Sequence, residues 1–489
     1  MQKFNTKSIL CKFDFYEYES NNSANDNLDV FNPYDNSLIT TLPSDSVSSA
    51  IEKINRMDCY RREERDFSII NNGHLLEKWH SKILEKKNDL ADLMVLEQGK
   101  PLAEAISEVE YGAAFIKWYS EEGKRIKGDL LESPYSDREF FVKRQPIGLV
   151  ATITPWNFPL AMFARKASAA LAAGCSVITK PAEDTPLTTL ALISLAREIG
   201  FIREILDAIV VPRSKVSEIG QLLCANQKIS KISFTGSTAV GKQLVLQGAG
   251  TLQKFSLELG GNAPFIVRED ADIELASEEL ILSKFRNAGQ TCVSANRIFV
   301  NDMVFDNFVS VFLRKVKAIK TGCGFEAGAQ IGPLINYAAA DRYEKIISDL
   351  KLSGAKFLHH KERGNEGLIF EPTVAVSAKT DVRAFNEEIF GPLAVIYKFE
   401  TDTEAIQQSN ATNYGLASYL FTESRQAIKN YTNSLEFGIV CVNAGTFSNS
   451  VAPFGGFKES GVGREGGKYG LEEFLETKFV SIRSEEHTS

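Results

Sequence analysis

The middle of this chain alternates short, β-branched apolar segments with longer segments rich in Ala and Leu. The first short segment, 148–153, ends just before Pro155, and the second, 176–179, is interrupted by Pro181. Both are apolar and too short for helices, so we predict a strand for each. Strands that alternate with helices form a parallel sheet with helices on both faces. The pattern therefore predicts an α/β fold.

The segments around these strands complete the pattern. A helix is expected over 160–173, and another from the capping residue Thr185 to Gly200. Further strands are expected over 207–211 and 231–234. Together these segments predict a βαβαβ unit, which implies a parallel sheet covered by helices on both faces.

Ligands of such sheets bind beyond the carboxyl ends of the strands. Trp156, Lys180 and Gly236 each fall at the end of a predicted strand, so we expect them to gather at one site. A second alternation follows, from Ala263 to about Val442. Its strands are expected near Phe265, Ile298, Ala394 and Ile439.

The composition limits the classes of function. A hydrophobic content of 44% is ordinary for a globular protein, and a net charge of −8 disfavours nucleic acid and anionic membranes as partners. No apolar run reaches the roughly 18 residues of a membrane helix. The N-terminus lacks a signal-peptide pattern. Seven cysteines without a CxxC pair predict reduced thiols, no metal site and a cytoplasmic location.

One cysteine stands apart from the others because of its surroundings. Cys292 follows a small Ala-Gly turn in the segment 285–292 (FRNAGQTC), at the end of an expected helix. Most lone cysteines are buried hydrophobes, but one in this position can act as a thiolate nucleophile. Glu258 stands just before Gly260 and Gly261. A nucleophile and a base on separate turns indicate two-step covalent chemistry.

Five segments together resemble the signatures of the NAD(P)-dependent aldehyde dehydrogenase superfamily, and the resemblance runs from about Val30 to about Ser481. Within the superfamily the chain most resembles succinate-semialdehyde dehydrogenases, through 96–102 (LEQGKPL), 453–456 and two arginines. The five segments are 154–159, 234–238, 257–262, 285–292 and 388–392.

The resemblance implies a Rossmann-like cofactor domain, an α/β catalytic domain and a small bridging β-sheet. The cofactor domain would comprise 1–131 and 147–258, and the catalytic domain 259–443. The bridging segments would be 132–146 and 470–489, and 444–469 would return to the active site. In the family this sheet joins subunits, so a homo-oligomer, either a dimer or a tetramer, is expected.

The resemblance also implies the chemistry. A thiolate adds to an aldehyde, the adduct expels hydride to a nicotinamide, and water then cleaves the thioester with the help of a base. Cys292 matches the nucleophile and Glu258 the base, whose pKa burial would raise. The side-chain amide of Asn157 and the backbone N–H of Cys292 match the oxyanion hole.

NAD is the expected cofactor, with NADP as an alternative. The segment 236–241 (GSTAVG) is weak evidence alone, but it follows a strand and opens a helix whose N–H groups suit pyrophosphate. Lys180 and Glu183 match positions at the adenosine ribose, and Glu388 one at the nicotinamide ribose. The residues that match cofactor contacts are Trp156, Lys180, Ala182, Glu183, Gly236, Ser237, Val240, Leu259, Glu388 and Phe390.

Arg165, Arg286 and Ser448 match residues that bind the substrate carboxylate in succinate-semialdehyde dehydrogenases. The alternative for both arginines is a structural ion pair. The expected reaction is the oxidation of succinate semialdehyde to succinate. Another ω-carboxy aldehyde, such as glutarate semialdehyde, is the nearer alternative. A catalytically silent binding protein is the further one, and the joint presence of Cys292, Glu258 and Asn157 argues against it.

Overall fold

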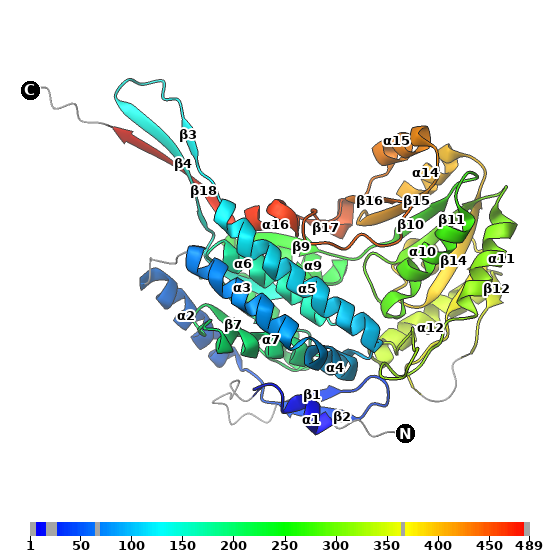
Figure 1. Cartoon of the computed structure of the whole chain (residues 1–489), viewed down its shortest axis with the longest axis horizontal. Helices are drawn as coiled ribbons and strands as arrows, with labels where there is room; N and C mark the ends of the chain where they lie inside the picture. The colour runs from blue at the N-terminus through cyan, green and yellow to red at the C-terminus, as the bar shows by residue number, and fades with distance from the viewer. Residues whose placement is uncertain (1–5, 16–26, 64–68, 363–366, 484–489) are drawn as a thin grey trace, which may run out of the picture.

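The computed structural model describes residues 6–15, 27–63, 69–362 and 367–483. Two large sheets, each with its own helices, lie next to each other, and a narrow three-stranded arm projects from one of them (Figure 1). The end of the expected bridging segment, 484–489, lies outside the described residues. Among the described helices, none has both the length and the apolar character needed to cross a bilayer.

The first large sheet has six strands in the order β17-β9-β8-β5-β6-β7, and all neighbours are parallel except β17 and β9. Chain order runs outward from β5 in both directions, so the carboxyl ends of β5 and β8 flank the crevice where ligands of such sheets bind. The α/β prediction is confirmed. The strands are β5 (Leu149–Ile153), β6 (Ser176–Lys180), β7 (Leu206–Ala208), β8 (Ile229–Thr235), β9 (Lys254–Glu258) and β17 (Gly461–Val462).

Helices cover both faces of this sheet. Along β5, Val150 points into one core, whereas Leu149 and Ala151 point into the other. A strand buried on both faces reads as a continuous apolar run, which is why its sequence carries no alternation. The helices α2, α8 and α9 contribute to the second core and α3 to α7 to the first. Their bounds are α2 (Val47–Glu63), α3 (Ile69–Glu85), α4 (Lys87–Gln98), α5 (Leu102–Glu122), α6 (Pro159–Ala172), α7 (Pro186–Glu198), α8 (Val216–Ala225) and α9 (Thr238–Gly248).

The cap of α7 differs from the expectation. Thr185 occupies the N-cap position, but its hydroxyl donates to the carbonyl of Trp156 at 3.3 Å. The buried carboxylate of Glu97 takes its place and accepts from the N–H groups of Leu187 and Thr188 at 2.7 and 2.8 Å. A carboxylate also suits the positive end of a helix. The cap of α7 therefore comes from α4, far away in the sequence.

The second large sheet has seven strands in the order β12-β13-β14-β11-β10-β15-β16, of which only the edge pair β12 and β13 is antiparallel. All four expected strands are present, and β12, β13 and β15 are additional. The strands are β10 (Ala263–Val267), β11 (Ala295–Asn301), β12 (Lys356–His359), β13 (Thr373–Val376), β14 (Leu393–Phe399), β15 (Ala417–Phe421) and β16 (Ile439–Val442). The helices are α10 (Ile273–Phe285), α11 (Phe305–Val316), α12 (Tyr337–Leu352), α13 (Arg383–Asn386), α14 (Asp402–Asn410) and α15 (Arg425–Ser434).

The arm is an antiparallel sheet of β3 (Asp129–Leu131), β4 (Arg138–Pro146) and β18 (Leu475–Arg483) (Figure 1). The pairing of β4 with β18 agrees with the two expected bridging segments. The third strand, β3, lies wholly before position 132, at which the first bridging segment was expected to start. The other described elements are α1 (Thr6–Leu10), β1 (Leu28–Phe31), β2 (Leu38–Leu42) and α16 (Gly467–Glu472).

Candidate active site

Residues 286–292, which we call the nucleophile loop, connect α10 to Cys292. The helix was expected to end at the nucleophile, but it ends at Phe285, so Arg286 lies just beyond it. Asn287, Ala288 and Gly289 then have φ angles of +52°, +56° and +72°. Residues other than glycine rarely adopt positive φ angles. Three positive-φ residues in succession form a tight turn, and contacts with the surrounding protein must stabilise this backbone conformation.

Close packing holds the nucleophile loop. A Cβ at Gly289 would lie 2.3 Å from the carbonyl oxygen of Gly391. A Cβ at Gly261 would lie 2.1 Å from the carbonyl oxygen of Cys292. Both positions therefore require glycine for steric reasons, and the positive φ of Gly289 adds a second reason at that position.

A polar network fixes Asn287 at the start of the turn. Its backbone N–H donates to Oε2 of Glu104 at 2.8 Å, and its side-chain oxygen accepts from Nε2 of Gln98 at 3.0 Å. Its Nδ2 donates to the carbonyl of Asn157 at 2.9 Å. Asn287 therefore links the nucleophile loop to the turn after β5, to the last residue of α4 and to the first turn of α5.

The turn after β5 holds Asn157, which is 5% exposed. Its carbonyl accepts from Nζ of Lys100 at 2.9 Å, and its Nδ2 donates to the carbonyl of Gln290 at 2.8 Å. An amide nitrogen carries two hydrogens, so one of them is left for a substrate oxygen. The geometry leaves Asn157 able to fill its expected role in the oxyanion hole, which stays a prediction.

The thiol of Cys292 is not a thiolate in this environment. Burial, helped by the negative charges of Glu388 and Glu258, raises the pKa of Cys292 to about 12, although the positive charges of Arg165 and Arg286 act in the opposite direction. At neutral pH the thiol therefore keeps its proton, and a neighbouring base must remove that proton before the sulfur can attack.

Glu258 is a suitable base by its environment. It lies at the end of β9, is 2% exposed, and its Oε2 lacks a hydrogen-bond partner among the described residues. Burial raises the pKa of Glu258 well above its ordinary value, and the negative charge of Glu465 adds to this effect. A carboxyl group with a raised pKa can accept a proton near neutral pH.

Glu465 belongs to a buried cluster of charges beside Glu258. It forms ion pairs with Arg165 and Lys166, both on α6. Buried charges need such partners because the protein interior solvates them poorly. The sequence analysis did not include Glu465 in the site, and no local pattern marks it.

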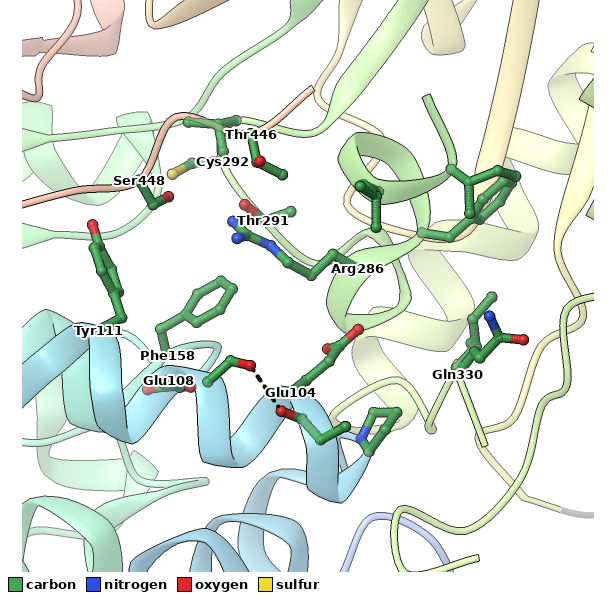
Figure 2. A pocket seen from close by; sticks show the side chains of 18 of the residues that line it. Glu104, Glu108, Tyr111, Phe158, Arg286, Thr291, Cys292, Gln330, Thr446 and Ser448 are labelled. Atoms are coloured by element: carbon green, nitrogen blue, oxygen red, sulfur yellow. Dashed lines mark hydrogen bonds between the residues drawn. The ribbon is translucent and has the colours of Figure 1, made fainter. Parts of the chain in front are cut away.

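A pocket of about 570 Å³ lies in front of Cys292, between α5, α6, α10 and the 446–448 segment. In Figure 2 the guanidinium of Arg286 points toward the middle of the pocket, and the hydroxyl of Tyr111 points toward Ser448 and Cys292. The pocket thus brings together the predicted substrate residues. Charged or polar groups in its wall include Glu104, Tyr111, Arg165, Arg286, Cys292 and Ser448.

The two arginines differ in their partners. Arg165 is 1% exposed and forms the ion pair with Glu465, so the structural alternative applies to part of its guanidinium, but its Nη2 lacks a hydrogen-bond partner among the described residues. Arg286 forms no ion pair within the described part of the chain, and its guanidinium lies 5.3 Å from the ring centre of Phe158. The pocket therefore contains a cation available to an anionic ligand.

Tyr111 on α5 is a pocket residue that the sequence analysis missed. Burial raises the pKa of Tyr111, and the positive charges of Arg165 and Arg286 partly offset that effect. A neutral phenol beside an arginine can donate to a carboxylate. Only the helical spacing of Tyr111 from Glu104 and Glu108 along α5 could have suggested it.

The residues predicted to bind the cofactor surround the carboxyl ends of β5, β6, β8 and β9. Ser237 caps α9 and accepts from the N–H of Val240 at 3.4 Å, and the exposed first turn of this helix offers N–H groups to an anion. Lys180 and Glu183 form an ion pair. Ala182 and Leu259 are buried beside them.

On the other side of the crevice, Glu388 accepts from the N–H of Gly261 at 2.9 Å, and burial raises the pKa of Glu388 to about 7. The rings of Trp156 and Phe390 meet edge to face with their centres 5.5 Å apart. Helix N–H groups, one cation and carboxylates have the donor and acceptor chemistry of a dinucleotide's phosphates and ribose hydroxyls. Within the described residues, no cluster of three His, Cys, Asp or Glu could hold a metal ion.

The strand order and the pocket define an α/β protein in which a cysteine pocket lies beside a crevice suited to a dinucleotide. A profile described as the Aldehyde dehydrogenase family matches residues 18–480. The chain belongs to this family.

Individual relatives agree with this assignment. The chain is 49% identical to a mitochondrial succinate-semialdehyde dehydrogenase of Oryza sativa, over 83% of this chain and 77% of the relative. It is 44% identical to a probable NADP(+) succinate-semialdehyde dehydrogenase of Sinorhizobium fredii and to a glutarate-semialdehyde dehydrogenase of Pseudomonas putida, covering 93% of this chain and 92% and 94% of those proteins. The crystal structure of an aldehyde dehydrogenase from Brucella melitensis superimposes with a TM-score of 0.91 at 46% identity, covering 94% of both chains.

Proposed function

We propose that this protein oxidises succinate semialdehyde to succinate with NAD. The observation that carries the proposal is the guanidinium of Arg286, which points into the same pocket as Cys292 and has no ion-pair partner in the described part of the chain. An aldehyde with a carboxylate a few carbons from its carbonyl would occupy both groups. The succinate-semialdehyde dehydrogenases among the relatives support the same substrate.

In the first half of the reaction, Glu258 takes the proton of Cys292, and Sγ attacks the aldehyde carbon to form a hemithioacetal. The free N–H of Asn157 and the backbone N–H of Cys292 stabilise the oxygen that becomes negative. Arg286, with Nη2 of Arg165, Ser448 and Tyr111, holds the distal carboxylate. A bidentate arginine contact fixes both the position and the direction of the substrate.

A bound nicotinamide would supply the acceptor for the hydride that leaves the hemithioacetal on Cys292. Glu388 would bind its ribose, Trp156 and Phe390 would pack beside it, and the first turn of α9 would bind the pyrophosphate. A thioester on Cys292 remains. Glu258 first releases the proton of Cys292 to solvent. It then removes a proton from water, the resulting hydroxide attacks the thioester carbon, and succinate leaves as this proton passes from Glu258 to the sulfur of Cys292.

Replacing Arg286 by Ala should raise KM for succinate semialdehyde and change KM for butanal little. Losing a charge-assisted contact to a carboxylate costs about 1.5–3 kcal/mol, which corresponds to about a ten- to hundredfold change. Steady-state kinetics on both aldehydes test this. Arg314→Ala, which removes an arginine paired with Glu274 on the surface, is the matched control and should change neither KM. Equal increases for both aldehydes in Arg286→Ala would indicate a structural arginine.

The preference for NAD should depend on Glu183. Its carboxylate can accept from the ribose hydroxyls of NAD and would repel the 2′-phosphate of NADP. Glu183→Ser should also release Lys180 from its ion pair, and so narrow the ratio of kcat/KM between NAD and NADP by about tenfold. Asp184→Asn, at a neighbouring carboxylate paired with Arg213, is the control. NADP is the rival, because several relatives are named NADP(+) enzymes. A wild type that favours NADP would overturn the preference.

The nearest alternative function is the oxidation of glutarate semialdehyde, which the P. putida relative favours. Measuring kcat/KM for ω-carboxy aldehydes of four, five and six carbons decides between the two. A maximum at four carbons supports succinate semialdehyde as the substrate, and a maximum at five carbons would show that glutarate semialdehyde is the preferred substrate. If no aldehyde were turned over, the remaining hypothesis would be a catalytically silent binding protein.

We further infer that the arm joins subunits of a cytoplasmic homo-oligomer. Leu130, Phe479 and Ile482 on the arm are 76, 55 and 50% exposed in the single chain. Apolar side chains on a projecting sheet gain stability from a partner that covers them. The seven cysteines are all free, in keeping with a reducing compartment. The domain boundaries expected from the sequence stay a proposal.

A further inference from the structure

Glu104 is a charged pocket residue to which the proposed reaction assigns no role. It lies in the first turn of α5, in the segment that follows the LEQGKPL motif. In Figure 2 its side chain rises from α5 toward Arg286, on the pocket wall opposite Cys292. A carboxylate is unexpected beside a site that should bind an anion, because like charges repel.

The contacts of Glu104 show which of its neighbours it engages. Its Oε2 accepts from the backbone N–H of Asn287 at 2.8 Å, the residue next to Arg286 in the nucleophile loop. Lys100, the nearest lysine along the chain, is instead paired with Glu108 and bonded to the carbonyl of Asn157. Glu104 and Arg286 form no ion pair in the described structure, although the charge of Arg286 acts on the Glu104 carboxyl.

We propose that Glu104 is a specificity-determining residue that anchors the nucleophile loop and weakens the hold of Arg286 on the substrate carboxylate. The hydrogen bond to Asn287 fixes the direction in which Arg286 leaves the loop. The negative charge of Glu104 lowers the positive potential at the guanidinium. Product carries the same distal carboxylate as substrate, so a weaker hold favours product release. This inference rests on the proposed function.

The environment of Glu104 places the pKa of its carboxyl group near neutral pH. Burial raises the pKa of Glu104 to about 7, and the charges of Lys100 and Arg286 and the N–H of Asn287 limit the rise, while Glu108 adds to it. Below pH 7 the carboxyl group is neutral and Arg286 binds an anion without competition. Above pH 7 the Glu104 carboxylate is charged and competes with the substrate carboxylate for the guanidinium of Arg286. In the wild type, KM for succinate semialdehyde relative to KM for butanal should therefore rise between pH 6 and pH 8.

Glu104→Gln tests the role of the charge. The glutamine amide oxygen can still accept from Asn287, so kcat for butanal should stay within about twofold of the wild type. Removing one negative charge near the bound carboxylate should lower KM for succinate semialdehyde about three- to tenfold at pH 8 and abolish the rise of the KM ratio with pH. Glu110→Gln, at an exposed carboxylate on the same helix, is the matched control and should change neither value.

Glu104→Ala tests the role of the anchor, because it removes the charge and the acceptor together. It should lower kcat for both aldehydes several-fold, whereas Glu104→Gln should not. Equal kcat values in the two variants would overturn the anchoring role. An unchanged ratio of the two KM values in Glu104→Gln, or a ratio in the wild type that does not vary with pH, would overturn the role of the charge. The proposed function fails separately, if wild-type enzyme shows no preference for the carboxylate-bearing aldehyde.

Discussion

Cys292→Ser should reduce dehydrogenase turnover by at least about a thousandfold while the protein still folds and binds its cofactor. A serine hydroxyl has a far higher pKa than a thiol and is a much weaker nucleophile at neutral pH. Because burial already raises the pKa of Cys292 to about 12, Glu258 would have to remove a still less acidic proton from serine. NADH absorbance measures turnover, and calorimetry measures NAD binding.

The control for this variant is Cys441→Ser. Cys441 is half-buried at the end of the second sheet, in β16, and does not line the pocket. It should keep wild-type activity and a similar Tm. Substantial activity in Cys292→Ser would show that another group attacks the aldehyde.

Glu258→Gln should slow steady-state turnover by about a hundredfold or more, in line with the usual contribution of a general base. Glu258 is the base in both steps, but water is a far weaker acid than the thiol of Cys292, so Glu258→Gln should slow thioester hydrolysis more than the first turnover. A first turnover of NADH should therefore appear as a burst, followed by a slow phase. Stopped-flow absorbance with excess substrate resolves the two phases.

The pH dependence of the wild type gives a second test of Glu258. Its pKa lies well above the ordinary value because of burial and the charge of Glu465, and only the deprotonated form acts as a base. Steady-state turnover of the wild type should therefore speed up as pH rises through the pKa of Glu258, and this rise should be missing in Glu258→Gln. Glu269→Gln, at an exposed carboxylate, should behave like the wild type. Equal slowing of burst and steady state would remove Glu258 from the hydrolysis step.

The sequence was most informative where one residue decides the local conformation. Pro155 and Pro181 end strands, and Gly174 ends α6 with a φ of +88°, so the strand and helix order of the first sheet follows from these positions. The edge strands β12 and β3 were not predicted from the sequence. Their short segments are partly exposed, and only pairing with a neighbouring strand specifies them.

The site was predictable only where a segment itself carries the chemistry. Cys292 and Asn157 lie in segments with distinctive turns. Glu465 lies just before α16, and Tyr111 lies on α5. Their positions in the site depend on how these elements pack against α6 and the pocket. The ion pair between Arg165 and Glu465 spans 300 positions of the chain, so no local pattern could reveal that Arg165 is already partly neutralised.

The nucleophile loop carries both the atom that reacts and the guanidinium that would recognise the far end of the substrate. Five residues lie between them, and three of these have positive φ angles, so the loop sets a fixed separation between Cys292 and the backbone of Arg286. Substitutions within the nucleophile loop therefore cannot easily adapt the pocket to a longer aldehyde. Such adaptation should arise on the opposite wall, where α5 and the 446–448 segment can recede or advance without moving Cys292. Related enzymes for longer and shorter acids would then differ mainly on that wall.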